Sequence, residues 1–156
     1  SYFTHAVEAI FSVGGTLDKF IGDCVMAFFG APVPQSDHAR RAVQAAIQIQ
    51  EAQEALNRER AARGLPTLLV RIAIQSGPVM VGDVGSRKRV DYTVLGNTVN
   101  VAARLESGVA EAGEITLGGE THRLLAGAFP TEPLGEFQLK GLQQKVYAFR
   151  VLRGGA

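Results

Sequence analysis

Two side chains able to bind an anion, the amide of Asn100 and the guanidinium of Arg104, lie four residues apart in the sequence. A glycine just before this stretch and its apolar spacing predict a helix over about 97–107. Residues one turn apart lie on the same side of a helix, and the dipole near a helix N-terminus favours negative charge. The pair therefore indicates a site that favours anions. A solvated polar helix face is the alternative, but the glycine and the polar end of the preceding strand favour a site.

The same segment indicates how this helix is held in place. Asn97 is a good N-cap residue. Val101, Ala102 and Leu105 lie on a different side from the polar pair, where they can face a sheet. Two strands, 79–84 and 90–95, are expected to precede the helix.

A second group of chemically useful residues lies near the N-terminus. Two short apolar runs, 17–21 and 24–29, are separated by Gly22-Asp23. A two-residue loop that starts with glycine is typical of a β-hairpin. Asp23 is therefore expected at the hairpin tip, where its carboxylate can project away from the sheet.

Lys19 lies within the first of these two strands. Alternate residues of a strand share a face, so Leu17, Lys19 and Ile21 are expected on one face. A lysine between two aliphatic residues is unusual because a buried ammonium needs a partner or a ligand. Taken alone, the segment favours the ordinary alternatives, which are a lysine that reaches solvent and a turn aspartate.

The other predicted elements surround these two segments. The pattern predicts a helix over 1–13 that Gly14-Gly15 ends, and a long helix over 37–62 that Ser36 or Asp37 caps. Further strands are expected at 67–74, 115–117, 134–139 and 145–152, with a short helix at 119–126. This order predicts an α+β domain with helices on one face of a mainly antiparallel sheet.

Composition excludes several function classes. The chain has 156 residues, a formal net charge of +1 and one cysteine, Cys24. A single domain is expected, without the global field that nucleic acid or an anionic membrane would require. An internal disulfide is excluded. No apolar run reaches the roughly 20 residues of a membrane helix. The three histidines are scattered, and no metal or catalytic role is assigned to His5, His38 or His122.

The two segments together resemble the class III adenylyl/guanylyl cyclase catalytic domain. The specific motifs are the Lys-Phe-Ile-Gly-Asp hairpin and the Gly-Asn-Thr-Val-Asn-Val-Ala-x-Arg segment. Further matches, in the family's order, are Gly14-Gly15, Gly30-Ala31-Pro32, Asp37-His38-Ala39, residues 77–85 and Lys140-Gly141. The resemblance implies one catalytic domain over 1–156 with a ferredoxin-like, palm-type core. It also implies a head-to-tail homodimer with active sites shared between the subunits, in the cytoplasm.

The resemblance also implies an activity, the conversion of ATP to cyclic AMP and pyrophosphate. Lys19 and Thr93 match the pair that selects the base. Lysine only donates hydrogen bonds and a threonine hydroxyl can accept one, so the pair suits adenine N1 and the adenine amino group. Guanine presents the opposite pattern, and guanylyl cyclases of this family usually carry Glu and Cys at these positions.

The remaining roles follow from the same resemblance. Asn100 would position the ribose, Arg104 would stabilise charge on the α-phosphate, and Lys140 would hold the terminal phosphates. Asp23 matches the second of two metal-binding aspartates, which bind two magnesium ions that manganese can replace. Three basic residues lie on a loop that crosses to the partner in relatives, or form a solvated turn: Arg87, Lys88 and Arg89.

One part of the family pattern is expected to be absent. The first metal-binding aspartate normally lies on a strand before the first helix, and no carboxylate before Asp18 can replace it, since Glu8 falls within the predicted helix. We therefore expect a piece of a longer protein whose metal site is incomplete and which is not fully active alone. An inactive nucleotide-binding or regulatory cyclase-like domain and a guanylyl cyclase are the alternatives. ATP is the expected partner, with no nucleic acid and no membrane contact by the domain itself.

Overall fold

The computed structural model describes residues 2–83 and 92–153, and its central feature is a four-stranded sheet. The strand order is β3 (Ile72–Ile74), β6 (Ile115–Gly118), β8 (Val146–Val151) and β7 (Thr131–Phe137). β3 pairs with β6 in parallel, whereas β6 with β8 and β7 with β8 are antiparallel. The predicted, mainly antiparallel α+β architecture is confirmed.

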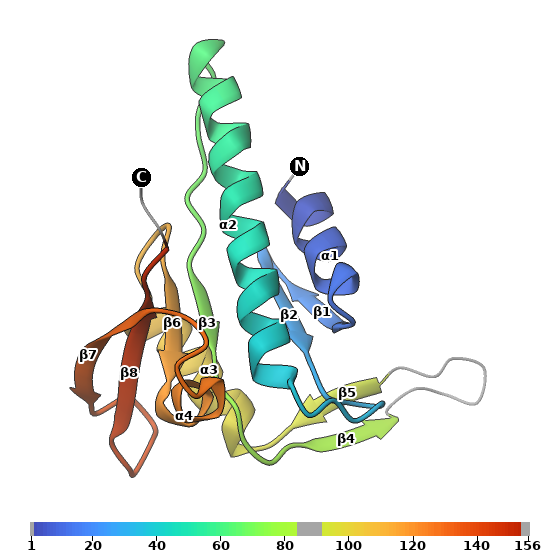
Figure 1. Cartoon of the computed structure of the whole chain (residues 1–156), viewed down its shortest axis with the longest axis vertical. Coiled ribbons are helices and arrows are strands. Elements are labelled where there is room, and N and C mark those ends of the chain that lie inside the picture. The colour runs from blue at the N-terminus through green and yellow to red at the C-terminus, as the bar shows by residue number, and fades with distance from the viewer. Residues whose placement is uncertain (1, 84–91, 154–156) are drawn as a thin grey trace.

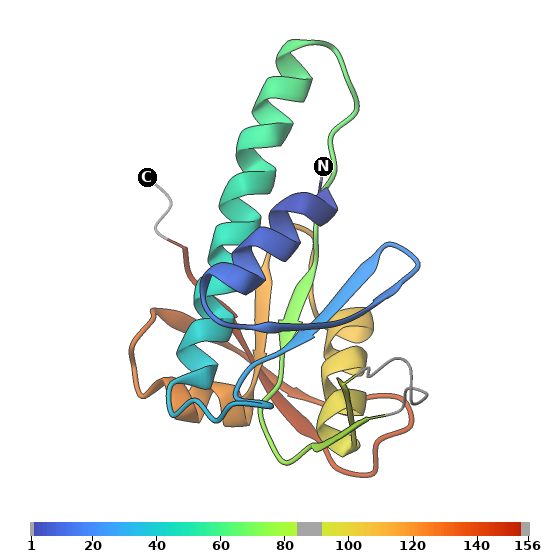
Figure 2. The same ribbon diagram turned by 90° about the vertical axis from the view of Figure 1, so that its right-hand side faces the viewer.

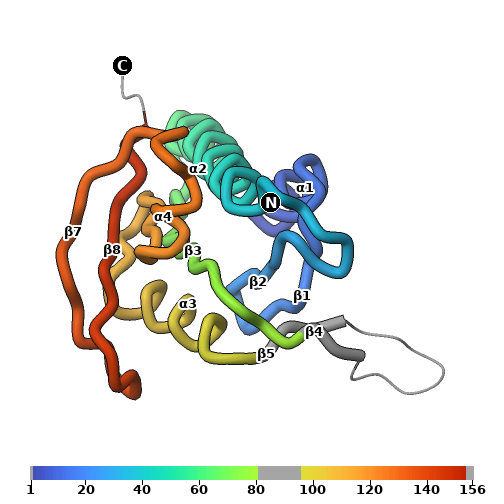
Figure 3. The backbone as a smooth tube through the Cα atoms, turned by 60° about the horizontal axis from the view of Figure 1, so that its bottom comes forward, coloured from blue at the N-terminus to red at the C-terminus, as the bar shows by residue number. Residues whose placement is uncertain are grey.

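Two β-hairpins accompany this sheet. The first joins β1 (Thr16–Ile21) to β2 (Cys24–Phe28), and the second joins β4 (Met80–Asp83) to β5 (Tyr92–Leu95). The first hairpin lies on the opposite side of the molecule from β7 and β8 (Figure 3). The strands of the second hairpin, β4 and β5, also lie away from β7 and β8 (Figure 1). The first hairpin was predicted from the sequence, and for the second the two strands were predicted.

Four helices are described: α1 (Tyr2–Ser12), α2 (His38–Ala62), α3 (Asn97–Gly108) and α4 (Gly119–Leu125). α2 is much the longest of them and extends beyond the strands (Figure 1). α1 packs across α2 (Figure 2), where Ala6 and Ala9 meet Ile49. None of the helices in the described part of the chain is long and apolar enough to cross a membrane.

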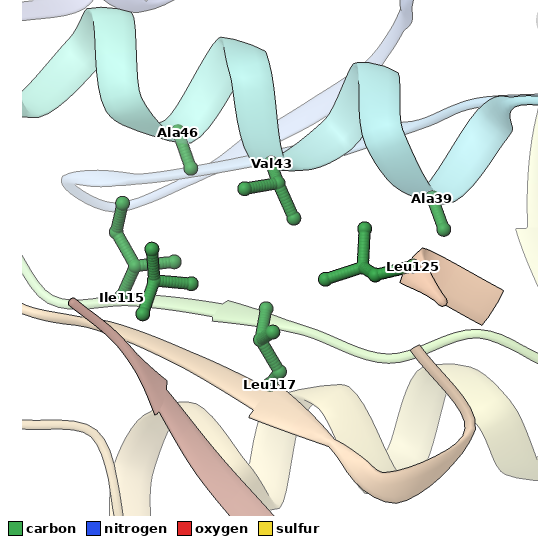
Figure 4. Packing of buried hydrophobic residues seen from close by; sticks show 7 residues of the cluster. Ala39, Val43, Ala46, Ile115, Leu117 and Leu125 are labelled. Carbon is green, nitrogen blue, oxygen red and sulfur yellow. The ribbon is translucent and has the colours of Figure 1, made fainter. Parts of the chain in front are cut away.

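One core lies between α2, α4 and the sheet. Val43 of α2 packs with Leu117 of β6 and Leu125 of α4, all of them at most 1% exposed (Figure 4). Ile115 and Leu117 are alternate residues of β6, so they point to the same face of the sheet. Burial of a side chain of this size contributes roughly 1.5–3 kcal/mol.

A second core lies under α3. Val101 and Leu105 of α3 pack with Ala148 of β8 and with Leu139. On β8, Ala148 belongs to this cluster and Val151 to the other one, and an odd separation along a strand places two side chains on opposite faces. Helices therefore cover both faces of the sheet. The expectation that all of them pack on one face is wrong for α3.

The strand expected over 67–74 is shorter than predicted, and side chains of α2 bind the backbone of its first part. Gln50 Nε2 donates to the carbonyl oxygen of Val70 over 2.9 Å, and Gln53 Nε2 donates to that of Leu68 over 3.2 Å. Asn57 Oδ1 accepts from the backbone N–H of Leu68 over 3.1 Å. The N–H group of Leu68 is thus bonded to α2 rather than to a neighbouring strand, whereas the carbonyl oxygen of Val70 also accepts from the backbone N–H of Gly113 over 2.8 Å. β3 begins only at Ile72.

Two smaller differences concern the ends of elements. β7 begins at Thr131, three residues before the predicted start at 134, and ends at Phe137. Asp37 is the N-cap residue of α2, but its side chain makes no capping bond. Its carboxylate instead accepts a hydrogen bond from Arg41 Nε over 2.8 Å.

Candidate active site

α3 presents the predicted polar pair on its exposed side. Asn100 and Arg104 are both exposed, whereas Val101 and Leu105 are 6% and 0% exposed. The burial of one side of α3 therefore fixes which way the amide and the guanidinium point. This confirms that Asn100 and Arg104 share a side of the helix away from the core.

The start of α3 differs from the prediction. Gly96 is the N-cap residue, with φ of 134°, and Asn97 is the first residue of the helix. The prediction that Asn97 caps the helix is wrong. A glycine accepts a positive φ at little steric cost, and the carbonyl oxygen of Gly96 accepts bonds from the N–H groups of Val99 and Asn100.

The loop between β7 and β8 brings Lys140 towards α3. Leu139 is 8% exposed and packs with Leu105, which anchors the loop against the helix. The next turn contains Gly141, with φ of 81°, and Arg104 Nη2 lies 3.8 Å from the position a Cβ atom would take on Gly141. Lys140 itself is exposed. The backbone next to Lys140 therefore lies beside the guanidinium of Arg104.

Lys19 lies on β1 and is exposed. The pairing of β1 with β2 is irregular between Leu17 and Lys19, which lie opposite the consecutive residues Ala27 and Met26. Directly opposed residues point to the same face, so Leu17 and Lys19 point to opposite faces. The expectation that Leu17 shares the face of Lys19 and Ile21 is therefore wrong.

The strand that carries Lys19 contacts the strand that carries Thr93. β1 lies against β5, and the backbone of Thr93 is paired opposite Gly82 of β4. The side chain of Thr93 lies outside the described part of the structure. Three other predicted residues lie entirely outside the described residues: Arg87, Lys88 and Arg89.

Asp23 is exposed at the tip of the first hairpin, as predicted. Gly22 has φ of 60° there, and a left-handed glycine in the first loop position is typical of a tight hairpin turn. Partial burial of the thiol raises the pKa of Cys24, and the nearby charges of Glu106 and Asp23 raise it further. Asp23 therefore lies in the same region as Glu106 of α3.

The metal ligands of this region are few. In residues 2–83 and 92–153, no group of three His, Cys, Asp or Glu side chains could hold a metal ion. Magnesium prefers oxygen ligands and is often held by one or two carboxylates together with substrate phosphates. Asp23 fits as one such ligand, but the described residues do not complete a metal site.

One residue of this region is missed by the sequence-based reasoning. Thr98 lies inside the second motif without an assigned role, and its hydroxyl donates to the carbonyl oxygen of Pro78 over 2.8 Å. No local pattern indicates this contact, because the partner lies 20 residues earlier in the chain.

The structure also contains an open groove of about 360 Å³ elsewhere. It lies between α2 and the end of β8, where Ile47, Phe129 and Val151 line it beside Glu51 and Glu54. None of the six predicted site residues lines it, so the groove is not the predicted nucleotide site.

The fold is the palm-type α+β fold of nucleotide cyclase domains. The family described as the adenylate and guanylate cyclase catalytic domain matches residues 17–152. The chain belongs to this family.

Relatives include enzymes named as adenylate cyclases. The chain is 35% identical to adenylate cyclase 1 of Rhizobium meliloti over 152 residues, which is 97% of this chain and 23% of that protein. It is 42% identical to an adenylate cyclase of Anabaena cylindrica over 103 residues, which is 64% of this chain and 20% of that protein. The chain thus spans less than a quarter of the length of these two relatives.

Solved structures of both substrate classes are similar to this chain. The adenylyl cyclase CyaB of P. aeruginosa has a TM-score of 0.86 at 34% identity, covering 99% of this chain and 80% of that one. The guanylate cyclase domain of RhGC from Catenaria anguillulae, in complex with GTP, has a TM-score of 0.84 at 31% identity, covering 97% and 79%. The fold is therefore common to both classes and does not distinguish ATP from GTP.

Proposed function

We propose that this chain is the catalytic domain of an adenylyl cyclase, which converts ATP to 3′,5′-cyclic AMP and pyrophosphate. The observation that carries the proposal is the placement of Arg104 beside Gly141, which follows Lys140, with Asn100 one turn away on the same exposed side of α3. Arg104 and Lys140 supply two positive charges and Asn100 a neutral hydrogen-bonding group. A triphosphate with an attached ribose matches this set.

In the proposed reaction, the ribose 3′-oxygen forms a bond to the α-phosphorus and the bond from that phosphorus to the pyrophosphate oxygen breaks. The proton of the 3′-hydroxyl is released. Asn100 would orient the ribose, and Arg104 would stabilise the negative charge that develops on the α-phosphate. Lys140 would neutralise the terminal phosphates as a point charge.

Adenine rather than guanine is proposed because of Lys19 and Thr93. The Lys19 ammonium can donate to adenine N1 and the Thr93 hydroxyl can accept from the adenine amino group. Contact between β1 and β5 supports this assignment, because it brings the backbones of the two residues into one region. Two relatives named as adenylate cyclases agree with it.

A homodimer with shared sites is part of the proposal, in which Asp23 of one chain serves the site built from Lys19, Thr93, Asn100, Arg104 and Lys140 of the other. Asp23 would provide one oxygen ligand to a divalent cation, magnesium or manganese. When bound, such an ion neutralises phosphate charge and lowers the pKa of a bound hydroxyl.

The proposal is tested by measuring cyclic nucleotide formation from ATP and from GTP with magnesium or manganese, using the protein at its full natural length. Cyclic AMP is expected, with a higher kcat/KM for ATP than for GTP. A preference for GTP would favour the guanylyl alternative. Binding of ATP without turnover would favour an inactive nucleotide-binding domain.

The shared site has its own test. Asp23→Ala and Arg104→Ala chains, each inactive alone, are mixed at equal concentration. Partial recovery is expected, because a mixed dimer contains one site with both residues intact. No recovery in a mixture that still dimerises contradicts shared sites.

A further inference from the structure

Apolar contacts fix which side of α3 faces the sheet, but they do not fix its exact placement. Val101 and Leu105, one turn apart, hold the helix against the sheet. Such contacts are non-directional and roughly proportional to area, so they define the placement of the helix less exactly than a directional hydrogen bond does. Asn100 and Arg104 need a more exact placement, because a misplacement of 1 Å can lower the rate of a reaction about 10²-fold.

A directional contact is present at the first turn of α3. Thr98 Oγ1 donates to the carbonyl oxygen of Pro78 over 2.8 Å. Pro78 lies in the connection between β3 and β4, which passes the start of α3 (Figures 1 and 2). The hydrogen bond therefore joins the helix to a segment that is distant in the sequence.

The approach of these two segments is close. A Cβ atom added at Gly77 would lie 2.6 Å from Thr98 Oγ1, so only glycine leaves room for the Thr98 hydroxyl there. Gly96 is also near, since a Cβ atom on it would meet the carbonyl oxygen of Pro78 at 3.7 Å. The Thr98 side chain thus fits against the backbone of residues 77–78.

The accepting segment is itself held on the core side. Ser76 Oγ and Thr121 Oγ1 are hydrogen-bonded over 2.8 Å, and the two residues are 9% and 0% exposed. The carbonyl oxygen of Pro78 is two residues from this buried bond. Thr98 consequently connects α3 to a support that is fixed through α4.

A second polar contact of α3, Arg71 with Glu106, is weaker among the contacts of the described residues. Arg71 Nη2 and Glu106 Oε1 are 3.4 Å apart, with side chains 47% and 34% exposed. Exposed ion pairs of this kind contribute little. Thr98 is the better-defined anchor of the helix.

We propose that Thr98 is a positioning residue, whose hydrogen bond to Pro78 sets the placement of α3 and so aligns Asn100 and Arg104 with a bound nucleotide. This inference rests on the proposed cyclase function of the same site. Thr98 itself does not contact the reacting atoms. Loss of the Thr98 hydroxyl affects turnover only through the placement of Asn100 and Arg104.

The test compares Thr98→Val, which removes the hydroxyl but keeps the shape, with Thr98→Ser, which keeps the hydroxyl. Thr16→Val is the matched control, because Thr16 Oγ1 also donates to a backbone carbonyl oxygen, that of Ala31, over 3.1 Å. For Thr98→Val, kcat for cyclic AMP formation is expected to fall about tenfold or more with KM changed much less. Thr98→Ser is expected to restore most of kcat, and Thr16→Val to lower Tm without this loss of kcat.

Two outcomes overturn the inference: an unchanged kcat in Thr98→Val, or an equal loss of kcat in Thr16→Val or Thr98→Ser. Amide hydrogen exchange gives a second measurement that does not need turnover. Exchange in residues 98–104 is expected to rise in Thr98→Val and not in Thr98→Ser, and equal exchange in the two variants contradicts the anchor. A wild-type protein without turnover contradicts the proposed function instead. The hydrogen-exchange measurement then still tests whether Thr98 holds α3 in place.

Discussion

Arg104 of α3 lies directly beside Gly141 in the loop between β7 and β8. Its Nη2 atom is 3.8 Å from the position that a Cβ atom would take on Gly141. The two residues are far apart in the sequence, and the packing of Leu139 against Leu105 brings them together. The guanidinium is thus held next to the residue that follows Lys140. This relationship supports the strongest of the functional predictions.

Replacing Arg104 by Ala is expected to lower kcat for cyclic AMP formation by about 10²–10³-fold, because a preorganised donor to the developing charge is lost. KM for ATP should change much less. Initial rates over a range of ATP concentrations measure both constants. Arg58→Ala on the exposed side of α2 is the control and should retain wild-type kcat; equal losses in the two variants would count against the role of Arg104.

Exchanging the base-selecting pair is expected to change the substrate. In the double variant Lys19→Glu, Thr93→Cys, the ratio of kcat/KM for ATP to that for GTP should fall by about tenfold or more. The two new side chains no longer match the hydrogen-bond donors and acceptors of adenine. Parallel assays with the two nucleotides measure the ratio. The single variants serve as controls and should impair both reactions, and an unchanged ratio in the double variant would show that these residues do not read the base.

Gln50 is expected to contribute strongly to stability. It is 2% exposed and donates to the carbonyl oxygens of Val70 and Glu114 over 2.9 and 3.1 Å. Gln50→Leu leaves both acceptors without this donor, which should lower the free energy of unfolding by about 1–3 kcal/mol. Urea unfolding measures the change. Gln44→Leu, at an exposed position of the same helix, should change it much less.

The ion pair of Asp37 predicts a dependence of stability on pH. The hydrogen bond from Arg41 lowers the pKa of Asp37 below its ordinary value of 3.8. A carboxyl group whose pKa is lower in the folded state stabilises the fold above its unfolded pKa, and this contribution is lost as the pH falls through the folded value. Asp37→Asn should therefore lower Tm slightly at neutral pH, and the difference from wild type should vanish well below pH 3.8. Thermal unfolding across this range measures it, and a difference that persists in acid would contradict the explanation.

Short-range features of the candidate site could be predicted from the sequence. The four-residue spacing of Asn100 and Arg104 places them on one side of a helix whatever else surrounds it, because the helical repeat is a property of the backbone. Gly22-Asp23 likewise specifies a tight turn, because glycine accepts the left-handed conformation found there. The two motifs were long enough to indicate the family, which the match over residues 17–152 confirms.

Contacts between distant segments were decided only by the tertiary structure. No local pattern places Lys140 near Arg104, joins Thr98 to Pro78, or puts α3 on the opposite face of the sheet from α2. The segment before Ile72 has the composition of a strand, yet side chains of α2 bind its backbone and β3 begins only at Ile72. The physical reason is that the local sequence determines whether a segment forms a helix or a strand and which residues share a face. Which elements then pack together depends on which apolar surfaces are buried and which polar groups form hydrogen bonds in the folded chain.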